Sequence, residues 1–124
     1  MIVLAIDTCD SRGSVAVLRD DSVLQVVVHD SGENYSCWML PAAGRALKAS
    51  GVEIGSVDGY AVAAGPGSFT GVRVGLTTVK AWGEVYGKRI ASVSRLEAVA
   101  IGWQPREPFL CLVGAQRRSS FQGL

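Results

Sequence analysis

Short apolar runs separated by polar turns open the chain. Hydrophobic residues dominate at 3–7, 14–18 and 23–29, and each run is short and rich in β-branched side chains, as expected of strands. The pair Asp20-Asp21 stands between the second and third runs, where acidic residues favour a turn. The pattern therefore predicts three consecutive strands that form an antiparallel meander.

Helical and strand patterns alternate after the meander. A helix is expected over residues 36–49, interrupted or kinked at Pro41 and closed by Gly51. The later elements are expected in this order: a buried strand of small apolar residues at 57–64, a second helix at 71–86 and a fifth strand at 89–93. This order implies an α/β fold, with a mixed five-stranded sheet and helices on its faces. It matches the ribonuclease-H-like topology that actin-like ATPases and two-metal nucleases use.

The last part of the chain begins this pattern again without completing it. A short helix at 96–101 and a polar, proline-bearing linker at 104–108 precede a predicted strand at 109–113 and the start of another strand. Because a lone hairpin cannot bury its own apolar face, we expect one lobe at residues 1–105 and the incomplete start of a second, similar lobe at 106–124. The alternative is that the tail packs on the edge of the first lobe.

A glycine-rich junction joins the fourth strand to the second helix. Its members are Gly65, Pro66, Gly67, Ser68, Phe69, Thr70, Gly71, Arg73 and Gly75. Ser68 or Thr70 can cap the helix, and the free N–H groups of the helix start could hold an anion or dock against protein. The motif lacks the Lys-Ser/Thr of a P-loop, and Thr70 stands where the dinucleotide fingerprint requires glycine. A turn built only for packing a helix on a sheet is the alternative.

The second helix has a wide apolar arc. Its polar residues form one narrow stripe of Arg73, Thr77, Lys80 and Glu84. Such a helix is expected to contact more than its own sheet, and the glycines at its start would let a second helix approach closely, although a tight core of the chain itself would also use them. We therefore expect a protein partner on the two helices. The residues expected to contact it are Leu40, Leu47, Gly71, Gly75, Val79 and Trp82.

Composition sets the outer limits of function. The 124 residues are 48% hydrophobic with a formal net charge of +1, so the chain lacks the basic stripe of an autonomous nucleic-acid binder. The N-terminus has neither the basic region of a signal peptide nor the length of a membrane span, and we expect a cytoplasmic protein. Cys9, Cys37 and Cys111 are far apart and His29 is the single histidine, so neither a metal site nor a disulfide framework is expected.

Two enzyme classes that use this topology differ in the groups they need. A two-metal nuclease needs carboxylates on the first strand, the first helix and the fourth strand, and only Asp7 is present among them. An actin-like kinase or ATPase is the stronger alternative, because residues 7–14 resemble a first phosphate loop that ends at Ser14. Asp7 could orient a metal-bound water and Thr8 could cap a phosphate oxygen. Asp7 could equally be a hydrogen-bonded turn residue, so ATP binding stays an open alternative.

Several segments together resemble the bacterial TsaB (YeaZ) family. They are Leu4-Ala5-Ile6-Asp7-Thr8 with Ser14-Val15-Ala16, Ser36 followed by Leu40-Pro41, the glycine motif from Gly65 to Gly75, and Val93-Ser94-Arg95-Leu96-Glu97-Ala98. The resemblance implies an actin-like (ASKHA) fold and a role in making threonylcarbamoyladenosine beside the anticodon of tRNA. It implies a non-catalytic subunit that pairs with the catalytic paralogue TsaD and supports the small ATPase TsaE, while TsaC supplies threonylcarbamoyl-adenylate. Transfer RNA would be contacted only through the complex.

The chain also differs from the catalytic paralogues of that family. Those proteins hold a metal with a pair of histidines on a helix, and a chain with only His29 cannot build that pair. We therefore assign no catalytic residue and no cofactor. Tyr35 stands where the TsaB family commonly has histidine, and residues 114–117 depart from its usual Asp-Ala-Arg turn. Pairing of two copies of the chain by twofold symmetry is an alternative to pairing with the paralogue.

Overall fold

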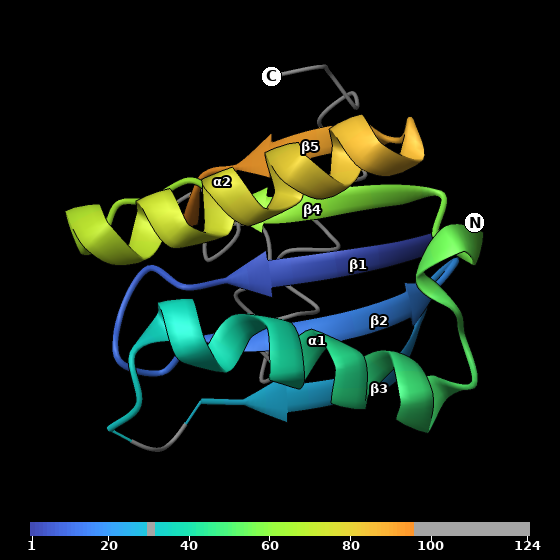
Figure 1. Cartoon of the computed structure of the whole chain (residues 1–124), viewed down its shortest axis with the longest axis horizontal. Coiled ribbons are helices and arrows are strands. Elements are labelled where there is room, and N and C mark those ends of the chain that lie inside the picture. Colours follow the sequence, from blue (N-terminus) through green and yellow to red (C-terminus); the bar gives the residue numbers. More distant parts are fainter. Residues whose placement is uncertain (30–31, 96–124) are drawn as a thin grey trace.

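A mixed five-stranded sheet with two long helices forms the structure (Figure 1). The computed structural model describes residues 1–29 and 32–95. The elements in chain order are β1 (Ile2–Asp7), β2 (Ser14–Arg19), β3 (Ser22–Val28), α1 (Tyr35–Ser50), a 3₁₀ turn η1 (Ile54–Ser56), β4 (Gly59–Ala63), α2 (Phe69–Tyr86) and β5 (Arg89–Val93). The predicted order of strands and helices is confirmed, and the short turn η1 is an addition to it. The elements expected after residue 95 lie outside the described residues.

The sheet combines a meander with two parallel crossovers. Its strand order is β3-β2-β1-β4-β5. β1 pairs antiparallel with β2, and β2 with β3, which confirms the predicted meander. Asp20 takes a left-handed φ of 52° in the turn between β2 and β3. β4 pairs parallel with both β1 and β5. Parallel neighbours require crossover connections, and α1 and α2 supply them. The mixed sheet inferred from the sequence is therefore confirmed.

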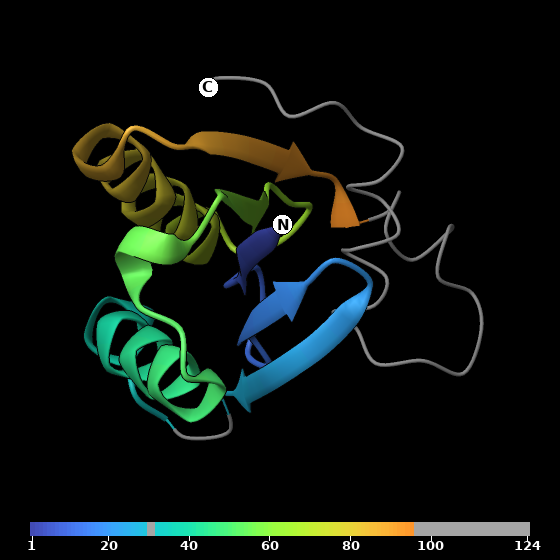
Figure 2. The same cartoon turned by 90° about the vertical axis from the view of Figure 1, so that its right-hand side faces the viewer.

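Both helices cover the same face of the sheet (Figures 1 and 2). Leu4 and Ile6 of β1 point to this face and pack with Met39 and Ala46 of α1 in the main core. The opposite face carries smaller side chains, in a second buried cluster. In that cluster a row of alanines runs across four paired strands: Ala16, Ala5, Ala61 and Ala91. Because β1 is buried on both faces, its sequence is a continuous apolar run rather than an alternating one.

Helix α1 passes through Pro41 without a break, so the predicted interruption is wrong. Proline removes the N–H that would bond to the carbonyl of Cys37, but both residues are exposed, and water can satisfy that carbonyl. The predicted end of the helix is confirmed. Gly51 takes a left-handed φ of 68° and donates its N–H to carbonyls of the last turn.

Helix α2 packs on the sheet through a stripe that consists mostly of glycine. Its buried residues are Gly71, Gly75, Val79 and Gly83, one in each turn. A Cβ added at Gly71 would lie 2.1 Å from the carbonyl oxygen of Thr8, and one at Gly75 would lie 2.7 Å from the Thr8 hydroxyl. Ser68 caps the helix by accepting a hydrogen bond from the Gly71 N–H at 3.3 Å. The helix backbone therefore approaches the end of β1 as closely as glycine permits.

Gly71→Ala is expected to lower the free energy of unfolding by about 1–3 kcal/mol, because the new methyl would have to displace a backbone carbonyl rather than a flexible side chain. Gly44→Ala is the matched control. A Cβ at Gly44, on the exposed side of α1, meets nothing within 4 Å, and helix propensity should raise stability there by about 0.5–1 kcal/mol. Urea unfolding followed by circular dichroism measures both changes. Equal stability of the two variants would contradict the close approach of α2.

Candidate functional site

The end of β1, the glycine motif and the end of β5 meet at one edge of the sheet. The Ser68 N–H donates to the carbonyl of Cys9 at 2.7 Å, and the Arg95 N–H donates to the carbonyl of Gly65 at 2.8 Å. Residues 7–14, expected as a phosphate loop, and the glycine motif are thus in direct contact. The carboxyl ends of parallel strands are where open α/β sheets usually bind ligands, so this edge is the first place to seek a site.

Arg95 binds both carboxylates at this edge. Its Nη2 lies 2.7 Å from Asp10 Oδ2, and its Nε lies 3.4 Å from Asp7 Oδ2. The other oxygen of Asp7 accepts the N–H of Cys9 at 2.9 Å. Partial burial alone would raise the pKa of Asp10, but hydrogen bonds from the Arg12 backbone N–H and the Arg95 guanidinium hold that pKa below its usual value. Asp7 is therefore the hydrogen-bonded turn residue that the sequence left as an alternative, with an ion pair added.

Thr8 and its neighbours also make hydrogen bonds and close contacts within the chain. The buried Thr8 hydroxyl donates to the carbonyl of Gly71 at 2.6 Å, and a Cβ at Gly67 would lie 2.3 Å from the carbonyl oxygen of Cys9. Burial, and then the nearby Asp7 carboxylate, raises the pKa of Cys9 to about 12, whereas Cys37 is exposed. Ser14 is buried at the start of β2. Within residues 1–29 and 32–95, no three His, Cys, Asp or Glu residues are grouped to hold a metal ion.

Tyr35 ties the same loop to the start of α1. Its hydroxyl accepts the Gly13 N–H at 2.6 Å and donates to the carbonyl of Asp10. The ring packs against His29, whose Nδ1 and Nε2 lie 3.1 Å from the Ser11 carbonyl oxygen and 2.7 Å from the Glu33 carbonyl oxygen. The histidine is therefore a buried loop anchor. Tyr35 therefore performs a structural task that the sequence alone did not indicate.

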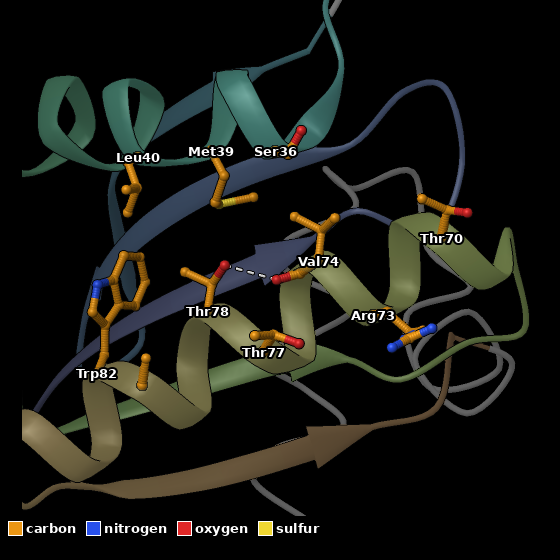
Figure 3. A pocket seen from close by; sticks show the side chains of 10 residues that line it. Ser36, Met39, Leu40, Thr70, Arg73, Val74, Thr77, Thr78 and Trp82 are labelled. Atoms are coloured by element: carbon orange, nitrogen blue, oxygen red, sulfur yellow. Dashed lines mark hydrogen bonds between the residues drawn. The ribbon is translucent and has the colours of Figure 1, made fainter.

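A groove of about 630 Å³ separates α1 from α2 on the side away from the sheet (Figure 3). Met39 and Leu40 point from α1 toward Val74 and Trp82 of α2. Leu40 is 61% exposed, and Trp82 is half-buried against Tyr60, with ring centroids 5.6 Å apart. The remaining lining residues are Ser36, Thr70, Arg73, Thr77, Thr78 and Ala81. The lining is therefore mixed, and the hydroxyl of Thr78, which lies between Val74 and Trp82, donates to the carbonyl of Val74 at 2.7 Å (Figure 3).

A second hollow continues the groove toward the starts of both helices. It has a volume of about 440 Å³ and shares three lining residues with the groove: Ser36, Thr70 and Val74. At the same end of α2, Phe69 is 74% exposed, and the guanidinium of Arg73 lies 5.2 Å from the centre of its ring. The open surface between the helices therefore extends from the start of α2 to Trp82.

Four of the six expected partner contacts are buried inside the chain. Gly71, Gly75 and Val79 are buried against the chain's own sheet, so they cannot reach a partner, because the tight internal packing considered as the alternative uses that side of α2. Leu47 is also in the core. Leu40 and Trp82 do line the open groove. Val74 was missed, although it lies two turns before Trp82 on the same side of the helix. Met39 also borders the groove, but it is buried in the core.

The predicted polar stripe of α2 is confirmed, since Arg73, Thr77, Lys80 and Glu84 are all exposed. Neither α1 nor α2, the two long helices in the described part of the chain, is long and apolar enough to cross a membrane.

Comparisons with known proteins agree on one family. The family model described as TsaD, tRNA N6-adenosine threonylcarbamoyltransferase, matches residues 26–122. The tRNA threonylcarbamoyladenosine biosynthesis protein TsaB of Bacillus subtilis (strain 168) is 35% identical over 100 residues, which cover 81% of this chain and 44% of TsaB. Among solved structures, YeaZ from Pseudomonas aeruginosa is similar with a TM-score of 0.71 and 31% identity, over 80% of this chain and 46% of YeaZ.

A more distant structure shows the fold alone. The ROK hexokinase from Thermus thermophilus superposes with a TM-score of 0.55 at 20% identity, over 82% of this chain and 36% of the hexokinase. The expected actin-like class is confirmed. The chain spans less than half the length of TsaB and of YeaZ.

Arg95→Met is expected to raise the pKa of Asp10, because the guanidinium that stabilises its carboxylate is lost. Asp20 is the matched control, since a hydrogen bond from the Met1 amino group lowers its pKa and the substitution leaves that bond intact. Carboxyl-carbon NMR titration measures both groups. Because the pKa of Asp10 is lowered in the folded chain, its carboxylate stabilises the fold at pH values above the usual aspartate pKa. That stabilisation is lost as the pH falls through the pKa of Asp10 in the folded chain. An unchanged Asp10 titration in the variant would contradict the ion pair.

Proposed function

We propose that this chain, which belongs to the TsaB and TsaD family of tRNA threonylcarbamoylation proteins, acts as a non-catalytic subunit in that modification. It pairs through α1 and α2 with a TsaD-type catalytic paralogue and supports the work of a TsaE-type ATPase. Transfer RNA is contacted only through the complex, and the role is cytoplasmic because tRNA is modified there. The pairing surface lies on these two helices of the described lobe.

The open groove between α1 and α2 is the observation that carries this proposal. Contiguous exposed apolar surface can mark a protein-interaction site, and here the 61% exposed Leu40 stands in a groove that Val74 and Trp82 also line. The side-chain ridges of one helix pack into the grooves between the side-chain rows of another helix. A paralogue of the same fold presents two such helices, so the occupant we propose is the equivalent helix pair of the TsaD-type protein.

Internal contacts of the residues considered as a phosphate loop also favour a role in binding a protein partner. Asp7 is held by Arg95 and the Cys9 N–H, and the Thr8 hydroxyl is held by Gly71. The Asp7 carboxylate and the Thr8 hydroxyl would have to leave these partners before they could orient a metal-bound water or bind a phosphate of a nucleotide. The same residues instead connect three segments of the fold, and this supports a structural task for them.

Leu40→Asp is expected to weaken pairing with the TsaD-type paralogue of the same genome at least about tenfold, because it removes an apolar contact and would bury a carboxylate. Val28→Asp is the matched control, since Val28 is 43% exposed at the end of β3 and lines neither the groove nor the second hollow. Size-exclusion chromatography with light scattering, followed by calorimetry, measures both. If Leu40→Asp paired as tightly as the unsubstituted chain, the groove would not be the pairing surface.

Reconstitution tests the function itself. A mixture of the paralogue, the ATPase, threonylcarbamoyl-adenylate and tRNA is expected to modify the tRNA only when the chain is added, and Leu40→Asp should fail where Val28→Asp succeeds. Modification at the full rate without the chain would refute the proposed role.

A further inference from the structure

The single histidine of the chain lies buried where three segments meet. His29 follows β3 directly and is only 5% exposed. Its backbone N–H donates to the carbonyl of Gly13 at 2.8 Å, which fixes the residue against the loop of residues 8–13. Its ring contacts the same loop on one side and the segment that leads into α1 on the other. The bonds of this ring therefore hold the loop and the start of α1 to the end of β3.

Both ring nitrogens of His29 face backbone carbonyl oxygens. Nδ1 lies 3.1 Å from the carbonyl oxygen of Ser11, and Nε2 lies 2.7 Å from the carbonyl oxygen of Glu33. A carbonyl oxygen can only accept a hydrogen bond, whereas a neutral imidazole has one N–H group and one bare nitrogen. A neutral ring would therefore bond to one carbonyl and turn a lone pair toward the other. The imidazolium ion has two N–H groups and satisfies both carbonyls.

Two aromatic rings beside His29 also favour a positive charge on it. The ring centres of Tyr35 and Trp38 lie 4.4 Å and 5.0 Å from the centre of the imidazole. Aromatic rings attract a cation at such distances, which offsets part of the cost of keeping a charge away from water. Charge-assisted hydrogen bonds from both nitrogens offset more of it. The contacts of the ring therefore stabilise its protonated form even though water scarcely reaches it.

We propose that His29 is held as the imidazolium ion in the folded chain, and that its second proton closes a pH-sensitive clasp between the loop of residues 8–13 and the start of α1. Loss of that proton breaks one of the two bonds between the ring and the carbonyls, so one side of the clasp opens. The clasp holds Glu33 and Tyr35, which line the second hollow. The inference is independent of the proposed function, because His29 lines neither the groove nor the second hollow.

Three neighbouring groups titrate away from the range in which histidine usually changes charge. Hydrogen bonds outweigh the effect of burial on Asp10 and hold its pKa below its usual value. Burial raises the pKa of Tyr35, and it raises the pKa of Cys9 to about 12. Within the described residues, the charged or titratable side chains on the segments that pack against the ring are Cys9, Asp10, Arg12, Glu33, Tyr35 and Cys37.

NMR can read the charge state of the ring directly, because His29 is the only histidine of the chain. A long-range proton–nitrogen correlation spectrum distinguishes the imidazolium ion, with two protonated nitrogens, from either neutral tautomer. At about pH 6.5, where an unperturbed histidine is half protonated, we expect about nine-tenths of His29 to carry both protons. A bare nitrogen in half or more of the molecules at that pH would overturn the proposal.

The stability of the chain should depend on pH through the same proton. A group that holds its proton more tightly in the folded chain adds stability at low pH, and this stability is lost as the pH rises through its titration in the folded chain. Between about pH 5.5 and about pH 8.5, the unfolding equilibrium constant should rise about tenfold more in the unsubstituted chain than in His29→Gln, which cannot take up the proton. Urea unfolding followed by circular dichroism at each pH measures the difference.

Tyr35→Phe is the matched control. It removes the hydroxyl that accepts the Gly13 N–H, but it leaves both ring bonds of His29 in place. This variant should be less stable at every pH and should keep the pH dependence of the unsubstituted chain. The Met1 amino group and the Cys37 thiol are common to all three chains, so differences between the profiles report on His29.

Parallel pH profiles for His29→Gln and the unsubstituted chain would overturn the clasp. Loss of the pH dependence in Tyr35→Phe as well would also overturn it, because the dependence would then follow the contact in general and not the proton on the ring. If His29→Gln does not fold, the spectrum of the unsubstituted chain still decides between the imidazolium ion and a neutral ring.

Discussion

The contact between the backbone of α2 and the end of β1 is the constraint on which the rest of the structure depends. Gly71 and Gly75 leave no side chain between the helix and Thr8, and the Thr8 hydroxyl bonds to the carbonyl of Gly71 at 2.6 Å. A hydrogen bond and a backbone contact at the same point hold the helix start in one position. The glycine motif is therefore best explained as the part that lets a helix lie directly on its sheet.

That close contact decides where the open surface of the molecule lies. Because the glycine stripe faces the sheet, the larger apolar residues of α2 lie on its sides, and Val74 and Trp82 turn toward α1. One part of the wide apolar arc therefore packs its backbone against the sheet, and the other part lines the groove with side chains. The same arrangement leaves the polar stripe, with its excess of basic residues, facing outward beside that groove.

The sequence was informative where the signal is local. The meander followed from short apolar runs and the Asp20-Asp21 turn, and the end of α1 followed from Gly51. It was uninformative where the answer depends on distant residues. Glycine has no side chain to mark a face as buried or exposed, so a helical projection could not show that Gly71 meets Thr8 rather than a partner helix. Asp10 and Arg95 are 85 positions apart, and no spacing rule indicates such an ion pair.

The most direct test of the account is the NMR response of the isotope-labelled chain to the unlabelled TsaD-type paralogue. The proposed binding surface is at Leu40 and Trp82, whereas Asp7 and Arg95 hold the fold together at the edge of the sheet. It predicts that the indole N–H of Trp82 and the amide of Leu40 shift or broaden on binding, while the amides of Thr8 and Gly67 keep their positions. Large changes at Thr8 and Gly67 with an unmoved Trp82 indole would contradict it and would place the binding site at the edge of the sheet.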